Sequence, residues 1–185
     1  GAFCIGSLQL VDETINQTQI LIVSPTRELS KQTYSVLEQL GTFMKISIQL
    51  LVGGTSIDED VRLLEKNEPQ FIVGCPGRVH DMMRRGYLKA KNIKLIVLDE
   101  ADEMLSSGFK EQVYNIFQKL NTNVQVALFS ATMPEELNSL TEKFMRDPLK
   151  ILVKSEMLTL EGISQYYIAV DDDQIKYNTL KDIFE

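Results

Sequence analysis

The sequence has little of what several protein classes need. It holds two cysteines, one histidine and no tryptophan among 185 residues. Cys4 and Cys75 predict no disulfide framework, and with His80 as the single histidine they cannot form a standard zinc site. Apolar runs such as residues 20–23 are too short to span a bilayer, and no basic segment precedes an apolar stretch at the N-terminus. We therefore expect an intracellular protein, cytoplasmic or nuclear, with no membrane partner.

Positive charge is also scarce. The chain has 19 Lys and Arg against 26 Asp and Glu, a net charge of −7. This balance argues against a nonspecific nucleic-acid binder, which is usually basic. It does not exclude a protein that grips phosphates through a few backbone amides and arginines. The length and the 44% hydrophobic share fit one packed domain, or one domain and the start of another.

Short β-rich runs alternate with helical patterns through most of the chain. Several runs, such as residues 95–98, are apolar on both faces, which is typical of parallel strands buried between helices. The alternation predicts an α/β fold with an open parallel sheet and helices on both faces. Ligands of such sheets bind at the carboxyl ends of the strands. We expect strands at residues 19–24, 46–52, 71–74, 95–99, 124–130 and 149–153.

Both ends of the sequence break this pattern. It opens in a helix-like segment, residues 2–11, with no strand before it. Near the other end, a polar stretch leads to a further strand at residues 163–170 and a helix with Asp173 as its N-cap. We therefore expect a chain cut at both ends. Its parts are a first domain over residues 1–153, a linker over 154–162 and the first strand and helix of a truncated second domain over 163–185.

The strongest motif is Asp99-Glu100-Ala101-Asp102, which follows the apolar run at residues 95–98. One carboxylate at a strand tip can hold a Mg²⁺-bound nucleotide, and its neighbour can position an attacking water. The alternative is a solvated strand end or a helix N-terminus. The full tetrad in this position favours the catalytic interpretation.

Four other turns follow expected strands. Ser130-Ala131-Thr132 could relay nucleotide state by hydrogen bonds, although alone it is more typical of a helix cap. Pro25-Thr26-Arg27-Glu28 opens a helix whose free amides, with Arg27, form a phosphate seat. Gly53-Gly54-Thr55 permits close backbone approach, and Pro76-Gly77-Arg78 repeats the helix start with an arginine. Each of these three is alone more typical of ordinary turns, but together they predict a track for a sugar–phosphate backbone.

In order and spacing, these motifs resemble those of the DEAD-box ATP-dependent RNA helicases. Residues 101–108, 143–148 and 158–163 resemble the translation initiation factor 4A subgroup of that family. The resemblance covers essentially the whole chain and implies a RecA-like fold of the P-loop NTPase type. It also implies ATP and Mg²⁺ as cofactors. Its implied partners are RNA, a second RecA-like domain and a scaffold protein activator.

The resemblance implies a role for each motif. Asp99 would hold Mg²⁺ through water, and Glu100 would orient the hydrolytic water. Asp102, Ser130 and Thr132 would couple nucleotide state to RNA binding. The RNA contacts, made to the backbone without regard to base sequence, would come from Thr26, Arg27, Gly53, Gly54, Pro76, Gly77 and Arg78.

The sequence also departs from the family pattern. The Gly-Lys-Thr phosphate loop, the glutamine motif that reads adenine and the second-domain motifs are absent from these 185 residues, and Gly1-Ala2-Phe3 resembles the residues that follow the loop. Without the loop, triphosphate binding loses its main electrostatic support, and loss of the loop's strand would leave sheet edges unpaired. Cys75, where the family usually has threonine, is a poor helix cap.

We interpret the sequence as the N-terminally truncated first RecA-like domain of a DEAD-box helicase, an enzyme that couples RNA-stimulated ATP hydrolysis to local duplex unwinding. The chain alone would be inactive. One alternative is a non-catalytic RNA- or protein-binding module that has lost the nucleotide site and binds RNA regardless of ATP, and the absent lysine loop favours it for this chain. Another is an unrelated P-loop-like ATPase acting on small molecules, against which the arginine and glycine turns argue.

Overall fold

The computed structural model describes residues 1–106, 108–152, 162–164 and 166–184. Gly1–Asp147 form one compact unit, and Pro148–Glu185 form a second. The first unit carries the sheet and all the motifs at strand ends. Each unit is described by itself.

The first unit is built on five parallel strands in the order β2-β3-β1-β4-β5. The three inner strands consist of apolar residues that are buried on both faces, as their sequences predict. The outer strands are partly exposed. The parallel α/β fold is therefore confirmed. The strands are β1 (Ile20–Val23), β2 (Ile48–Leu51), β3 (Phe71–Gly74), β4 (Leu95–Leu98) and β5 (Gln125–Leu128).

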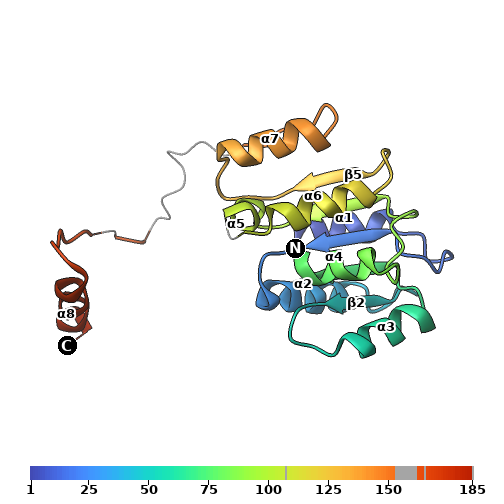
Figure 1. Ribbon diagram of the computed structural model, residues 1–185, viewed down its shortest axis with the longest axis horizontal. Helices are drawn as coiled ribbons and strands as arrows, with labels where there is room; N and C mark the ends of the chain where they lie inside the picture. Colours follow the sequence, from blue (N-terminus) through green and yellow to red (C-terminus); the bar gives the residue numbers. More distant parts are fainter. Residues whose placement is uncertain (107, 153–161, 165, 185) are drawn as a thin grey trace. The chain divides into compact units, whose positions relative to one another are not determined.

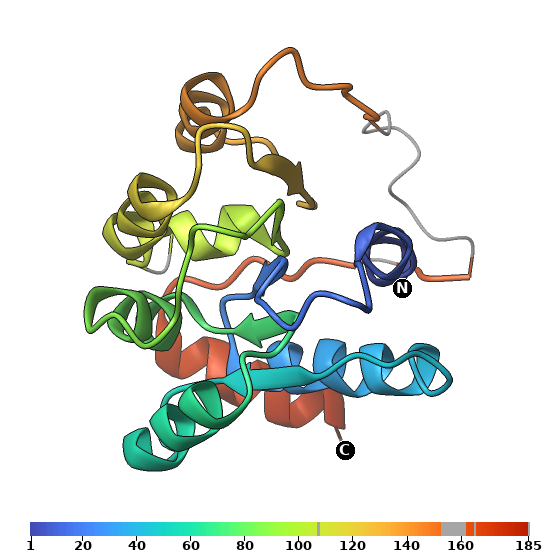
Figure 2. The same cartoon turned by 90° about the vertical axis from the view of Figure 1, so that its right-hand side faces the viewer.

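Helices cover both faces of this sheet, and two separate apolar cores result (Figures 1 and 2). On one face, α1 (Ala2–Leu10) and α2 (Arg27–Leu40) supply Cys4, Leu8 and Leu37 to the core. The other face is covered by α3 (Ile57–Lys66), α4 (Pro76–Arg84), α5 (Ala101–Ser106), α6 (Lys110–Lys119) and α7 (Glu135–Phe144). Burial on both sides holds the strand ends, and hence the motif turns, in fixed positions.

Two expected strands are absent from the described residues. Residues 149–152 of the expected strand 149–153 form no ladder, and Leu149 is 88% exposed. The described part of residues 163–170 likewise contains no strand, and Tyr167 is 94% exposed. The apolar composition of both segments suits a strand, but a strand forms only against a neighbour that pairs its backbone groups. Both predictions were wrong for this chain.

The helix expected near the C-terminus is present as α8 (Asp173–Phe184). Its N-cap is Asp172 and not Asp173, because Oδ1 of Asp172 accepts a 2.8 Å hydrogen bond from the N–H of Ile175. The expected linker lies outside the described residues except for Gly162. Among the described helices, none has the length and apolar character needed to cross a membrane.

Candidate functional site

The parallel strands deliver five turns to one side of the sheet, which we call the carboxyl edge. In the strand register, Val23 at the end of β1 lies beside Gly74 of β3 and Leu98 of β4. Leu98 in turn lies beside Leu128 at the end of β5. The structure therefore brings together the turns at residues 24–28, 52–55, 75–78, 99–102 and 129–132.

Asp99 and Glu100 lie where β4 passes into α5. The N–H of Asp99 donates a 2.9 Å hydrogen bond to the carbonyl of Val23, and the carbonyl of Glu100 accepts the first helical bond from Met104. Glu100 has a φ of 51°, in the left-handed region. That conformation costs a non-glycine residue about 1–2 kcal/mol, and such outliers cluster at functional sites.

Asp99 is half-buried beside the start of α1. Burial raises the pKa of its carboxyl, and the N–H of Glu100 and the positive amino terminus of Gly1 oppose that shift. The first turn of α1, with its free N–H groups, is therefore close to this carboxylate. The ring of Phe3 in α1 lies 5.1 Å from that of Phe129, the residue after β5. A carboxylate beside a helix N-terminus can serve a hydrated cation and a phosphate together.

Asp102, Ser130 and Thr132 form a cluster that joins α5 to the turn after β5. The hydroxyl of Thr132 donates a 2.6 Å hydrogen bond to Oδ2 of Asp102, and the hydroxyl of Ser130 donates to the carbonyl of Thr132 at 2.7 Å. Burial by itself raises the pKa of Asp102, but the hydroxyls of Thr132 and Ser130 and nearby backbone N–H groups hold it below its ordinary value. Oδ1 of Asp102 is buried and has no hydrogen-bond partner among the described residues.

Thr26 and Arg27 begin α2 as the sequence predicts. The hydroxyl of Thr26 caps the helix by accepting a 3.2 Å hydrogen bond from the N–H of Leu29. The exposed Arg27 lies against the glycine pair, because a Cβ on Gly54 would come 2.5 Å from Nη1 of Arg27. Gly54 also has a φ of +82°, which suits only glycine. The arginine and the two glycines thus form one surface at the carboxyl edge.

Arg78 is placed differently from Arg27. Its guanidinium forms an ion pair with Asp60 of α3, and the side chains of both residues are 8% exposed. The same guanidinium donates hydrogen bonds to the carbonyl of Thr55 at 2.9 Å and to its hydroxyl at 3.2 Å. Burial raises the pKa of Asp60, and Arg78 and Thr55 oppose the shift. Arg78 therefore fastens the turn after the glycine pair to α3 and α4.

The start of α4 combines a weak cap with open space. Cys75 is the N-cap and makes no side-chain capping bond, as expected for cysteine; its Sγ lies 3.5 Å from Oγ of the buried Ser30. Pro76 occupies the first turn and is buried. Gly77 is exposed, and a Cβ added there would meet nothing within 4 Å. A ligand backbone can therefore approach the helix N-terminus closely at Gly77.

Sequence patterns missed three participants in this edge. Asp60 is one of three acidic residues in the first turn of α3, and no motif marks it as the partner of Arg78. The contact between Phe3 and Phe129 joins segments at opposite ends of the first unit, which no local pattern reveals. Within the part of the chain that the structure describes, no group of three or more His, Cys, Asp and Glu side chains could hold a metal ion.

A family model for "DEAD/DEAH box helicase" matches residues 1–140. The chain belongs to this family. It is 52% identical to two proteins named ATP-dependent RNA helicase eIF4A, from Pyricularia oryzae and Chaetomium globosum, over 183 residues. Each match covers 99% of this chain but 46% of the relative, so the chain spans about half of these relatives' length.

Solved structures of DEAD-box helicases share the fold. Saccharomyces cerevisiae Dbp5 bound to RNA and ADP BeF3 matches with a TM-score of 0.84 and 31% identity, covering 99% of this chain and 46% of that one. A DEAD box protein from Methanococcus jannaschii matches with a TM-score of 0.75 and 39% identity, covering 79% and 39% of the two chains. The RecA-like fold is therefore confirmed.

Proposed function

We propose that this chain supplies the first ATP- and RNA-binding lobe of an RNA-stimulated ATPase that separates short RNA duplexes. The observation that carries the proposal is the strand register, which puts the carboxylates of the Asp-Glu-Ala-Asp motif and the arginine and glycine turns on one edge. The names of the relatives support it, since they are ATP-dependent RNA helicases. ATP is thus the nucleotide, and RNA is the polymer that stimulates its use.

Two carboxylates divide the hydrolytic chemistry. Glu100, held at the strand tip by its left-handed backbone, orients the attacking water. Asp99 fits a hydrated Mg²⁺, because it is a half-buried carboxylate beside a helix N-terminus and Mg²⁺ is commonly held through one or two carboxylates and retained waters. When bound there, the ion neutralises charge on the phosphates. The phosphates themselves face the N–H groups that open α1.

RNA follows the other part of the carboxyl edge. Arg27 and the helix N-termini at Thr26 and Pro76 bind phosphates, and the bare backbone at Gly53, Gly54 and Gly77 lets sugars approach. Arg78 contributes to this path by fixing the Thr55 turn, in addition to any phosphate it contacts. Contacts of this kind carry no base specificity, so the lobe accepts unrelated RNA sequences.

The bond between Asp102 and Thr132 connects the two parts of the edge. Asp102 is two residues from Glu100, and Thr132 lies in the turn that leads to α7. A change in nucleotide state at the carboxylates can therefore alter the turn after β5 through one hydrogen bond.

Partners complete the site in the longer protein. We propose that residues 163–185 begin a second RecA-like domain that closes over ATP and RNA, since the relatives are about twice as long as this chain. A scaffold protein that activates the enzyme is a further proposed partner. One structural neighbour is described as Dbp5 bound to Nup159, Gle1, IP6 and ADP, so a related helicase assembles with other proteins.

The test is RNA-stimulated ATP hydrolysis by the longer protein, together with RNA binding measured with and without a non-hydrolysable ATP analogue. We expect hydrolysis to need RNA and tight RNA binding to need the analogue. A non-catalytic RNA-binding module would bind RNA equally in both conditions. A small-molecule ATPase would turn over at the same rate without RNA, and either result would contradict the proposal.

A further inference from the structure

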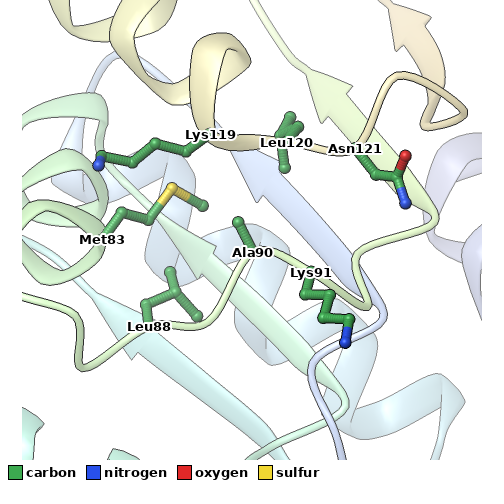
Figure 3. A pocket seen from close by; sticks show the side chains of 7 residues that line it. All are labelled: Met83, Leu88, Ala90, Lys91, Lys119, Leu120 and Asn121. Atoms are coloured by element: carbon green, nitrogen blue, oxygen red, sulfur yellow. The ribbon is translucent and has the colours of Figure 1, made fainter.

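We propose that a pocket on the side of the sheet opposite the carboxyl edge binds an acidic segment of a partner protein, with one apolar side chain of that segment inserted. The pocket has a volume of about 450 Å³. It is formed by the end of α4, the loop before β4 and the end of α6 (Figure 3). Because this loop and the turn after α6 precede parallel strands, the pocket lies at their amino ends. Its lining residues are Met83, Leu88, Ala90, Lys91, Lys119, Leu120 and Asn121.

The floor of the pocket is apolar. Met83, Leu88 and Leu120 are 4%, 3% and 9% exposed and belong to the core between the sheet and α3–α7. Ala90 packs against the same core. An apolar side chain that entered the pocket would extend this core outward, and the flexible thioether of Met83 can adapt to its shape. The volume falls within the range of about 300–1,000 Å³ that ligand pockets have.

The rim of the pocket is positively charged, although the chain as a whole is acidic. Positions 84–94 hold five of the 19 Lys and Arg residues and no Asp or Glu. Figure 3 shows the ammonium groups of Lys91 and Lys119 on opposite sides of Ala90. Within the described residues neither lysine has a carboxylate partner.

The carboxylates near this rim are already engaged. Glu68 pairs with Lys89 at 3.5 Å, and Asp81 pairs with Arg84 and Arg85 at 2.8 and 2.9 Å. The two pocket lysines therefore remain available to carboxylates from outside the chain. Charges placed around an apolar anchor speed association and exclude wrong partners.

Neither the dipole of α6 nor a bound RNA strand would use both the floor and the rim of the pocket. Lys119 lies in the last turn of α6, where it complements the helix dipole, but Lys91 lies in a loop and gains nothing from that effect. An RNA strand would find phosphate partners in the lysines but no aromatic side chain among the lining residues on which a base could stack. An apolar anchor flanked by Asp and Glu uses both the floor and the rim.

The experiment uses this chain labelled at its Met, Leu and Ala methyl groups, followed by NMR during titration. The probe is a pool of synthetic peptides, each with one Leu, Ile, Phe or Met between Asp and Glu residues. Two matched pools replace either the anchor with Ser or the acidic residues with Asn and Gln. We expect the acidic, anchored pool alone to shift the methyl signals of Met83, Leu88, Ala90 and Leu120, with shifts that diminish as salt is added.

A pair of charge reversals completes the test. Lys119→Glu should weaken peptide binding by about tenfold or more, since it replaces an attraction with a repulsion. Lys66→Glu is the matched control, because Lys66 is also an exposed lysine in the last turn of a ten-residue helix. It should leave binding unchanged, and thermal melts should show both variants folded.

Absence of methyl shifts with the acidic, anchored pool would overturn the proposal. Equal shifts with the Ser pool, or with a single-stranded RNA, would also overturn it, because the site would then bind polyanions in general. The readout needs neither ATP nor hydrolysis. A negative result here therefore leaves the proposed ATPase intact, and a failure of RNA-stimulated hydrolysis leaves this pocket intact.

Discussion

The hydroxyl of Thr132 donates a 2.6 Å hydrogen bond to Oδ2 of Asp102, thirty positions earlier in the chain. This bond joins the end of the Asp-Glu-Ala-Asp motif to the Ser-Ala-Thr turn. It forms because β4 and β5 are neighbours in register, so the turns after them meet. It is the direct link between the carboxylates and the segment that leads into α7.

The bond predicts how Asp102 titrates. Its folded pKa is lowered, so its contribution to stability is present above its unfolded pKa and is lost as the pH falls through the folded value. Thr132→Val removes the donor and should raise the pKa of Asp102, measured by NMR titration of the labelled carboxyl carbon. Ser139→Ala is the control, because Ser139 donates to the carbonyl of Glu135. An unchanged midpoint in Thr132→Val would mean that the hydroxyl does not stabilise the carboxylate.

Arg78 and Arg27 should differ in their effect on stability. Arg78→Ala leaves the buried Asp60 without its cation and should lower the free energy of unfolding by about 3 kcal/mol, read from urea denaturation. Arg27→Ala removes an exposed side chain and should change it by less than about 0.5 kcal/mol. Equal effects of the two substitutions would contradict the fastening role of Arg78.

Arg27 should act on RNA through charge. In the longer protein with an ATP analogue, Arg27→Ala should weaken binding to unrelated single strands by similar factors and reduce the slope of log K against log salt by about one charge. Lys66→Ala, on the far end of α3, should change neither quantity. A change of sequence preference in Arg27→Ala, or an unaltered slope, would remove Arg27 from the RNA path.

The 185-residue chain alone should hydrolyse ATP negligibly, with or without RNA. The loop lysine and its amide cradle, which supply much of the electrostatic support for a triphosphate, are not among its residues. Phosphate release from ATP, measured beside the longer protein, checks this. Turnover comparable to that of the longer protein, and abolished by Glu100→Gln, would contradict it.

The sequence was sufficient for the sheet and for the order of the motifs. Residues 71–74 and 95–98 are apolar on both faces, and they form β3 and β4 with those bounds. The parallel arrangement then put the motif turns on one edge, which follows from topology alone. Local composition determines these features, so they could be predicted.

Pairings between distant residues could not be predicted. The segment 149–152 has strand composition but forms no ladder, because pairing depends on a neighbour and not on the segment itself. The partner of Arg78 is Asp60, one of three acidic residues in a helical turn, and only packing selects among them. Similarly, Asp172 caps α8 in a run of three aspartates whose sequence does not mark which one lies just before the helix.

The most direct test of the account is Glu100→Gln in the longer protein. Glutamine keeps the size of the side chain but cannot orient and polarise water as a carboxylate does, and loss of one such group commonly costs several kcal/mol of barrier. We expect RNA-stimulated ATP turnover to fall by about two to three orders of magnitude, while ATP and RNA binding persist. Turnover at the normal rate in Glu100→Gln would show that this carboxylate is not the catalytic residue and would contradict the proposed function of the edge.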